Sequence, residues 1–247
     1  MRLLLLNPNT SAEVTELLAR AARAAVAPGT EIVPATAHRG VPYIATRAEA
    51  AVGGEVALEM LARHGQDVDA VIVAAFGDPG LGALRELAPV PVVGLAEAAM
   101  LTACMLGARF SIVTFATALG PWYRECVAYH GLLGRLAAIR MLDAPFRAIG
   151  DVQTEKADLL VDLACRTVVE DEADVVILAG APLAGLAATV RDRIPVPVVD
   201  GAAAAARQAE TLAALDLRKA TAGTFRRPAG KPSTGLDPAL ARLIGGA

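Results

Sequence analysis

The feature that most constrains this chain is an internal repeat. The segment DAVIVAAFGDPG, at 69–80, returns as DVVILAGAPLAG at 174–185. In each copy an Asp precedes a short β-branched apolar run, and small residues, a Gly/Pro turn and an Ala/Leu-rich stretch follow it. Each copy then leads through a charged segment into PVPVV, at 89–93 and again at 195–199. A repeat of this size indicates that one supersecondary unit occurs twice.

The repeat predicts an α/β fold with two pseudo-symmetric halves, each a mainly parallel sheet flanked by helices, and a cleft between them. Short apolar runs that alternate with helical patterns are typical of buried parallel strands and their covering helices. We expect the first half at 1–100 and 200–215 and the second at 101–199. The polar, Gly/Pro-rich segment 216–247 is expected to be a flexible tail or an arm onto a neighbouring subunit.

Composition excludes several classes of protein. Hydrophobic residues make up 55% of the chain, yet no apolar run approaches the roughly 20 residues of a membrane span. The N-terminal LLLL is too short for a signal peptide, so we interpret it as a strand and expect a cytoplasmic protein without membrane contact. A net charge of -3 gives no basic surface for nucleic acid. The many Ala/Leu helices make a homo-oligomer plausible.

Polar residues follow the first expected strand, Leu3 to Leu6. The segment NPNTS, at 7–11, breaks the strand at Pro8, and Thr10 with Glu13 has the spacing of a capping box. The helix start that follows, with its free N–H groups and two hydroxyls, suits an anionic or carbonyl oxygen; a plain N-cap is the alternative. By pseudo-symmetry, residues 114–117 take the corresponding place in the second half.

Three further polar residues have two interpretations each. Asp78, in GDPG, is expected to cap the helix that follows it, although a catalytic carboxylate is possible. Glu97 falls in an apolar helix and is either a satisfied structural carboxylate or a functional acid. His130, before Gly131, is interpreted as a neighbour of a helix C-cap and not as a base.

The three cysteines, Cys104, Cys126 and Cys165, each lie inside an apolar helical pattern. They lack metal-ligand spacing, so we interpret them as small core residues and expect no metal and no cofactor.

Several motifs together resemble one family. With NPNTS after the first strand, FGDPGL after the third, PVVGLAEAAM, and the ending PVVDGAAAA, the chain resembles the hydantoin and allantoin racemases of the Asp/Glu racemase superfamily from Met1 to about Leu215. This resemblance implies a cofactor-free mechanism in which two cysteines, one from each half, flank an acidic C–H. One thiolate removes the proton and the opposite thiol returns one on the other face, while backbone N–H groups stabilise the enolate.

Both cysteines of that pattern are missing here. The first would immediately precede FGDPG, where this chain has Ala75, and the second would fall at Gly180. Pro182 also replaces a small residue and removes an N–H donor from the second loop. Two-thiol racemisation is therefore not expected, since each proton transfer would lose about 10²–10⁴-fold.

The site is expected where the two loop ends face each other beyond the strands. Tyr43 and Tyr123 are the candidate proton donors, provided that a pocket lowers the pKa of the phenol. Tyr43 could close over the pocket together with Arg47, although both could equally be surface residues. The candidate binding residues are Asn9, Thr10, Ser11, Ala75, Phe76, Gly77, Thr114, Thr117, Gly180 and Ala181.

We interpret the protein as a cofactor-independent enzyme that acts on a carbonyl, carboxylate or ureide compound by divergent isomerase or lyase (decarboxylase) chemistry. The alternatives are a noncatalytic small-molecule binder and a hydantoin or allantoin racemase variant with a substitute acid/base. A deliberate replacement of the cysteines is disfavoured by the altered context AGAPLAG. Loss of two thiols is expected to enlarge the pocket and to favour a bulkier, less polar ligand.

Overall fold

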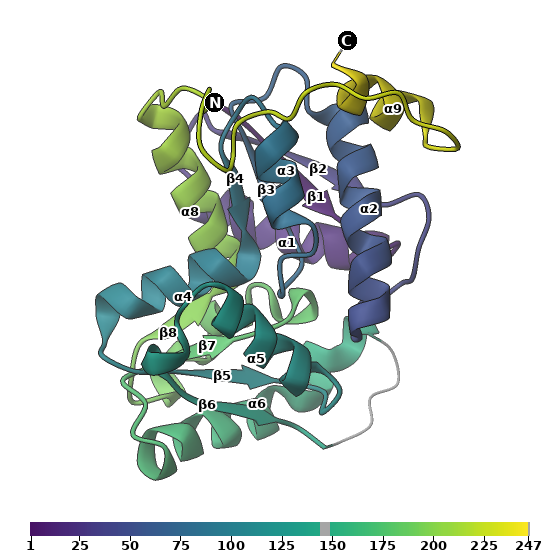
Figure 1. Cartoon of the computed structure of the whole chain (residues 1–247). Coiled ribbons are helices and arrows are strands. Elements are labelled where there is room, and N and C mark those ends of the chain that lie inside the picture. The colour runs from purple at the N-terminus through teal and green to yellow at the C-terminus, as the bar shows by residue number, and fades with distance from the viewer. Residues whose placement is uncertain (144–148, 247) are drawn as a thin grey trace.

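The computed structural model describes residues 1–143 and 149–246 and contains two parallel sheets of the same topology (Figure 1). The first sheet has the order β2-β1-β3-β4 and the second β6-β5-β7-β8. Its strands are β1 (Arg2–Asn7), β2 (Glu31–Thr36), β3 (Ala70–Val73), β4 (Val92–Gly94), β5 (Phe110–Thr114), β6 (Leu136–Met141), β7 (Val175–Leu178) and β8 (Val198–Asp200). The predicted α/β class and its two equivalent parallel sheets are confirmed.

The Asp that opens each repeat forms a hydrogen bond to the neighbouring strand of its sheet. The Asp69 carboxylate accepts a 2.7 Å hydrogen bond from the backbone N–H of Arg2, at the start of β1. The Asp174 carboxylate accepts the corresponding bond, 2.9 Å long, from Arg109 just before β5. Each Asp therefore fixes the register of its own strand against the central strand of its sheet.

The helices are α1 (Ala12–Ala25), α2 (Arg47–His64), α3 (Leu81–Leu87), α4 (Leu95–Leu106), α5 (Leu119–Tyr129), α6 (Val152–Glu170), α7 (Leu186–Val190), α8 (Gly201–Ala214) and α9 (Pro238–Gly245). The cap of α1 lies one residue later than predicted. Ser11, not Thr10, accepts the 3.2 Å hydrogen bond from the N–H of Val14. Thr10 still lies in the preceding loop, where its N–H donates to the carbonyl of Val41.

Alternation along the first strands divides the core. Leu3 and Leu5 point into one hydrophobic cluster, which continues into the second half, whereas Leu4 and Leu6 point into a second cluster under α2 and α3. A strand buried on both faces needs a continuous apolar run, which explains LLLL.

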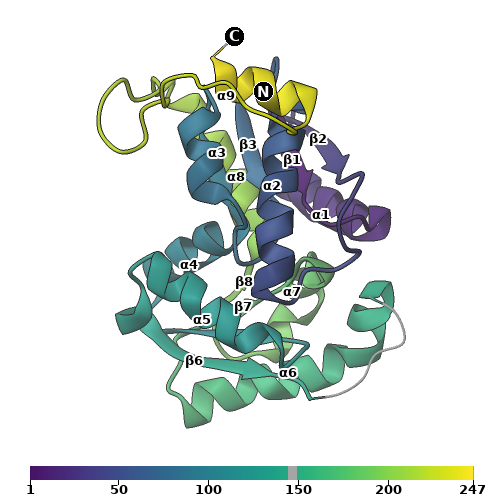
Figure 2. The same cartoon turned by 45° about the vertical axis from the view of Figure 1, so that its right-hand side comes forward.

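Two helices near the C-terminus return to the first half (Figures 1 and 2). α8 leaves β8 and packs against α1, α4 and β3. The end of the chain was expected to be a flexible tail or an intersubunit arm, but its last helix, α9, packs against α2 of the same chain. Asp237 caps α9 and pairs with Arg63 at 2.5 Å, and Leu240 is buried.

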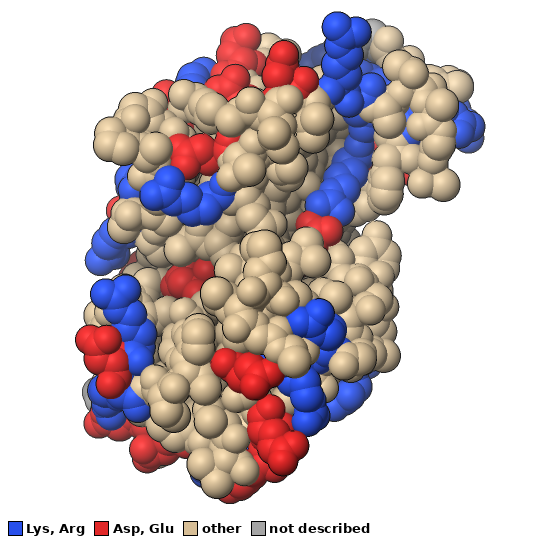
Figure 3. All heavy atoms as spheres, turned by 90° about the vertical axis from the view of Figure 1, so that its left-hand side faces the viewer, with Lys and Arg blue, Asp and Glu red and all other residues tan. Residues whose placement is uncertain are grey.

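The surface carries charges of both signs. On the face in Figure 3, Lys and Arg lie next to Asp and Glu at several places from one end to the other, with uncharged surface between these groups. Among the described residues, no helix combines the length and apolar character that crossing a bilayer would require.

Candidate active site

A small pocket lies between the two halves, beyond the carboxyl ends of β1, β3 and β7. Its walls come from the loops after β1, β2, β3 and β7 and from the start of α5. The lining residues are Asn9, Tyr43, Ile44, Ala75, Phe76, Trp122, Tyr123, Gly180, Ala181 and Pro182. The structure therefore brings the two repeat loops, at Ala75 and Gly180, to one pocket, and no cysteine is among the described residues that line it.

Aromatic rings fill the space between the loops. The ring of Tyr123 packs 4.7 Å from Phe76 and 5.6 Å from Trp122, and Tyr43 packs 5.6 Å from Phe115. The remaining volume is about 20 Å³, enough for roughly one water molecule. Rings from both halves close over the space, so the loss of two thiols leaves no open cavity in the described part of this structure, and the preference for a bulkier ligand stays a prediction.

Gly180 has no room for a side chain. Its φ is +116°, a conformation that favours glycine, and a Cβ there would lie 2.7 Å from Cε1 of Phe115. A thiol at this position would have to displace both the loop backbone and the ring. The backbone conformation of the second loop and the position of the Phe115 ring therefore both require a glycine at position 180.

Tyr43 presents an unused hydrogen-bond donor. Its hydroxyl is buried and has no hydrogen-bond partner among the described residues. A buried hydroxyl without a partner costs about 1–3 kcal/mol. Burial, with a contribution from Glu49, raises the pKa of this phenol above its usual value.

Tyr123 lies on the opposite wall and is 2% exposed. Its hydroxyl is 3.6 Å from the point that a Cβ on Gly180 would occupy. Burial raises the pKa of Tyr123 well above its ordinary value, and a hydrogen bond with Thr114 offsets only part of this shift. The condition that the pocket lowers a phenol pKa is therefore wrong for both tyrosines, because burial destabilises the phenolate. Both phenols are protonated at neutral pH.

Several predicted binding residues either lie outside the pocket lining or have polar groups that are already hydrogen-bonded within the protein. Asn9 lines it, but its Oδ1 already accepts a 2.9 Å bond from the N–H of Ser11, which in turn caps α1. The Thr114 hydroxyl donates to the carbonyl of Ala179 at 2.8 Å, and Thr117 is exposed. The sequence analysis missed Ile44, Trp122 and Pro182 as lining residues; the lone Trp beside Tyr123 was a usable signal.

Asp78 does cap a helix, but not the predicted one. Its two carboxylate oxygens accept 2.8 Å bonds from the N–H groups of Ala96 and Glu97, at the start of α4. Gly80, at φ +79°, takes the N-cap position of α3, two residues further along. The loop therefore turns the Asp78 side chain away from α3.

Glu97 and His130 make side-chain contacts that the sequence did not indicate. Glu97 accepts a 2.9 Å bond from Nη1 of Arg85 and a second one from Nη2, so it is a paired structural carboxylate. His130 is the C-cap of α5 as expected, yet its side chain is buried beside Asp78 and Glu97. Arg47 is exposed and pairs with Glu125 across the two halves.

Comparison with known proteins gives one consistent result. The family model for Asp/Glu/hydantoin racemase matches residues 3–209. The hydantoin racemase of Paenarthrobacter aurescens is 35% identical over 233 residues, which is 94% of this chain and 99% of that protein. The solved allantoin racemase from Klebsiella pneumoniae has 36% identity and a TM-score of 0.92, with 97% of this chain and 98% of that chain covered. The allantoin racemase from Pseudomonas fluorescens has 35% identity and a TM-score of 0.89, with 95% and 100% covered.

Proposed function

The chain belongs to the Asp/Glu/hydantoin racemase family, and from that premise we propose that it is a cofactor-independent enzyme acting on a small carbonyl, carboxylate or ureide compound in the pocket between Tyr43 and Tyr123. The relatives named hydantoin racemase and allantoin racemase support this class of substrate. The unpartnered hydroxyl of Tyr43 supports it as well, because a carbonyl or carboxylate oxygen is the acceptor that this donor lacks.

The single observation that carries the reaction type is a pocket with two protonated phenols and no base. Among its described lining residues, none has a thiolate, carboxylate, amine or imidazole. Racemisation requires a base to remove a proton from carbon, whereas loss of CO₂ from a malonate-type acid creates the same enolate without one. We therefore favour a lyase of the decarboxylase type over an isomerase.

The proposed steps balance as follows. The bond from the α-carbon to one carboxyl group breaks, CO₂ leaves, and the electron pair remains as an enolate whose oxygen accepts a hydrogen bond from Tyr43. The Tyr123 phenol then donates its proton to the α-carbon, and the resulting phenolate recovers a proton from solvent. A raised phenol pKa suits this order, since Tyr123 stays protonated until a stronger base, the enolate, forms.

Ligand entry requires the aromatic walls to move, since the volume of about 20 Å³ is too small for such a compound. Tyr43 and Phe76 belong to the first half, and Trp122 and Tyr123 belong to the second. A small separation of the halves would therefore open the pocket.

The test is incubation with aryl- and alkyl-malonates and with chiral hydantoins in D₂O, followed by NMR. A decarboxylase releases CO₂ and places one deuterium on the product carbon. A racemase exchanges the substrate C–H instead, and a raised melting temperature without product or exchange indicates a noncatalytic binder. Either of the last two results contradicts the lyase proposal.

Single substitutions of the two tyrosines test their proposed roles as hydrogen-bond donor and proton donor. Tyr123→Phe is expected to lower kcat by about 10²–10⁴-fold, and Tyr43→Phe by about 10²–10³-fold. Tyr129→Phe is the control, because Tyr129 is 68% exposed and outside this pocket. Unchanged turnover in the first two variants would remove both assigned roles.

A further inference from the structure

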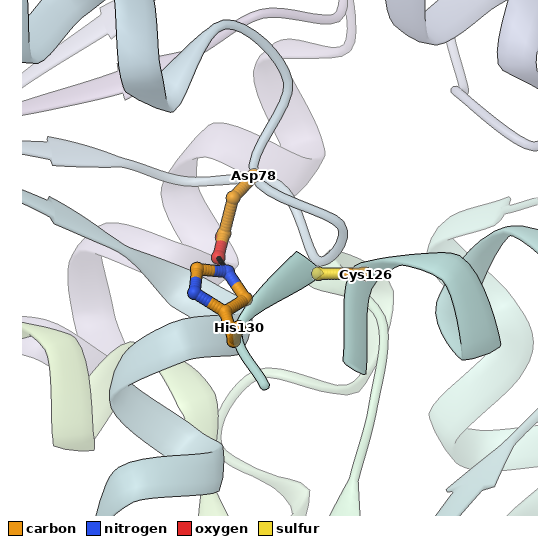
Figure 4. Close-up of side chains that lie close together, drawn as sticks. All are labelled: Asp78, Cys126 and His130. Atoms are coloured by element: carbon orange, nitrogen blue, oxygen red, sulfur yellow. Dashed lines mark ion pairs between the residues drawn. The ribbon is translucent and has the colours of Figure 1, made fainter. Parts of the chain in front are cut away.

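Three potential metal ligands meet on the other side of Trp122 from the phenol pocket. Asp78, Cys126 and His130 each offer one ligand atom, and these atoms all lie within 4.8 Å of one another, with Asp78 and His130 close together and Cys126 to one side (Figure 4). Cys126 and His130 are four residues apart at the end of α5, so one helix face presents both. Asp78 comes from the loop after β3, in the other half of the molecule.

The imidazole of His130 supplies an independent sign of a missing ligand. Its Nε2 is buried and makes no hydrogen bond among the described residues, although the side chain is only 7% exposed. The nearest carboxylate oxygen, Oδ2 of Asp78, is 3.4 Å away. A buried ring nitrogen without a well-directed hydrogen bond is costly. Either protonation, which would pair the ring with Asp78, or a bound cation would satisfy it.

The groups around these side chains are arranged like an outer coordination shell. Nδ1 of His130 lies 3.6 Å from the Glu97 carboxylate, which Arg85 holds in place. Metal-bound histidines generally direct their second nitrogen to such a carboxylate, which orients the ring. The Asp78 carboxylate is itself fixed by two backbone N–H groups at the start of α4.

A hollow of about 420 Å³ opens beside the cluster and is lined by all three side chains together with Trp122 and Glu125. Three protein ligands would leave one position on a tetrahedral ion, and this hollow gives it access to water or to a ligand oxygen.

We propose that Asp78, Cys126 and His130 bind a divalent transition metal ion of the zinc class. One sulfur, one nitrogen and one oxygen donor favour such an ion over Mg²⁺ or Ca²⁺, which prefer oxygen alone. Tetrahedral zinc places its ligand atoms about 3.3–3.7 Å apart, so the widest pair in the cluster would have to close by up to about 1–1.5 Å on binding. Because the ligands come from both halves, the bound ion would tie the β3 loop to α5.

The sequence analysis found no metal spacing because it considered the cysteines apart from His130.

The test is a titration of chelator-treated full-length protein with Co²⁺, followed by competition with Zn²⁺. We expect one equivalent to bind and a thiolate-to-cobalt charge-transfer band in the near ultraviolet. Cys126→Ser should abolish the band, and His130→Gln should weaken Zn²⁺ binding by more than about 100-fold, beyond the usual effect of an outer-shell change. Zn²⁺ should raise the melting temperature of the unmodified protein but not of these variants.

Cys104→Ser and His38→Gln are the matched controls, since both residues lie outside the cluster, and they should leave binding and the band unchanged. Glu97→Gln should lower the affinity by about 10–100-fold through the orientation of His130. Asp78→Asn is the weaker probe because Asp78 also caps α4. Absence of stoichiometric binding, or a band that survives Cys126→Ser, would overturn the proposal and leave His130 as a cation paired with Asp78 and Glu97.

Discussion

The loop after β3 and the loop after β7 occupy equivalent places in two sheets of the same topology, yet their side chains make different contacts. Both enter their next helix through a left-handed glycine, Gly80 at φ +79° and Gly185 at φ +87°. Between strand and glycine the side chains diverge, with FGD in the first loop and APL in the second. The duplicated backbone therefore sets where the loops lie, and the side chains decide what each loop contacts.

The hydrogen bond between the loop and the following helix start runs in opposite directions in the two halves. In the first half, Asp78 in the loop accepts hydrogen bonds from the start of α4. In the second half the loop is the donor, because the N–H of Gly185 donates at 2.6 Å to Asp200, the N-cap of α8. The position equivalent to Asp78 is Leu183, so the proposed metal site has no counterpart in the second half.

The largest difference between the two loops is expected when Gly77→Ala is compared with Pro182→Ala, the substitution at the equivalent position of the other loop. Gly77 has φ +110°, and a Cβ there would overlap the Trp122 indole. We expect Gly77→Ala to lower the free energy of unfolding by about 3–4 kcal/mol from backbone strain and overpacking. Pro182→Ala should cost far less, and urea denaturation measures both. Equal costs would contradict the asymmetry of the loops.

Introducing one cysteine at a time, at Ala75 and at Gly180, is the next test. Gly180→Cys should cost about 2–3 kcal/mol, because a side chain there needs a strained φ and displaces Phe115. Ala75→Cys adds one sulfur to an existing Cβ and should cost less than about 1.5 kcal/mol. Thermal and urea unfolding compare the two variants, and a Gly180→Cys variant as stable as Ala75→Cys would show that the second loop adapts freely.

A third test concerns the pH dependence of stability at Asp200. Burial raises the pKa of this carboxyl above its usual value. The folded state therefore holds the proton more tightly than the unfolded state, so the stabilisation from Asp200 is complete below the unfolded pKa and is lost as the pH rises through the folded pKa.

The measurement is urea unfolding of the unmodified protein and of Asp200→Asn from about pH 4 upward. The difference in unfolding free energy between them, unmodified minus variant, should fall as the pH rises. Both proteins share every other titrating group, so the difference isolates this carboxyl. A difference that grows with pH would reverse the assigned direction.

The smallest expected effects come from the pair of Asp residues that open the repeats. Asp69→Ala removes one hydrogen bond, from the N–H of Arg2, whereas Asp174→Ala removes two that share one oxygen, from the N–H groups of Ala108 and Arg109, and each substitution should cost about 1 kcal/mol. Agreement between the two costs, measured by urea denaturation, would show that this part of the duplication is energetically symmetric. A cost confined to one half would break that symmetry.

Much of the fold was accessible from the sequence, and much of the site was not. The two copies of a βα unit, the buried strands and the approach of Ala75 to Gly180 all follow from the repeat and its apolar runs. The closure of the pocket by aromatic rings could not be predicted. Phe76, Phe115 and Trp122 are apolar residues, and the directions of their side chains depend on packing against the opposite half. The cluster at His130 was missed because its third member, Asp78, is far away in the sequence.

The sequence by itself determined two equivalent parallel sheets and the two equivalent loops at Ala75 and Gly180, because apolar periodicity and turn residues act over only a few neighbours along the chain. Only the tertiary structure decided that rings close the pocket, that Asp78 caps α4, and that Cys126, His130 and Asp78 meet. Those outcomes depend on how two halves pack against each other, and the packing of side chains across an interface is set by shape in three dimensions and not by spacing along the chain.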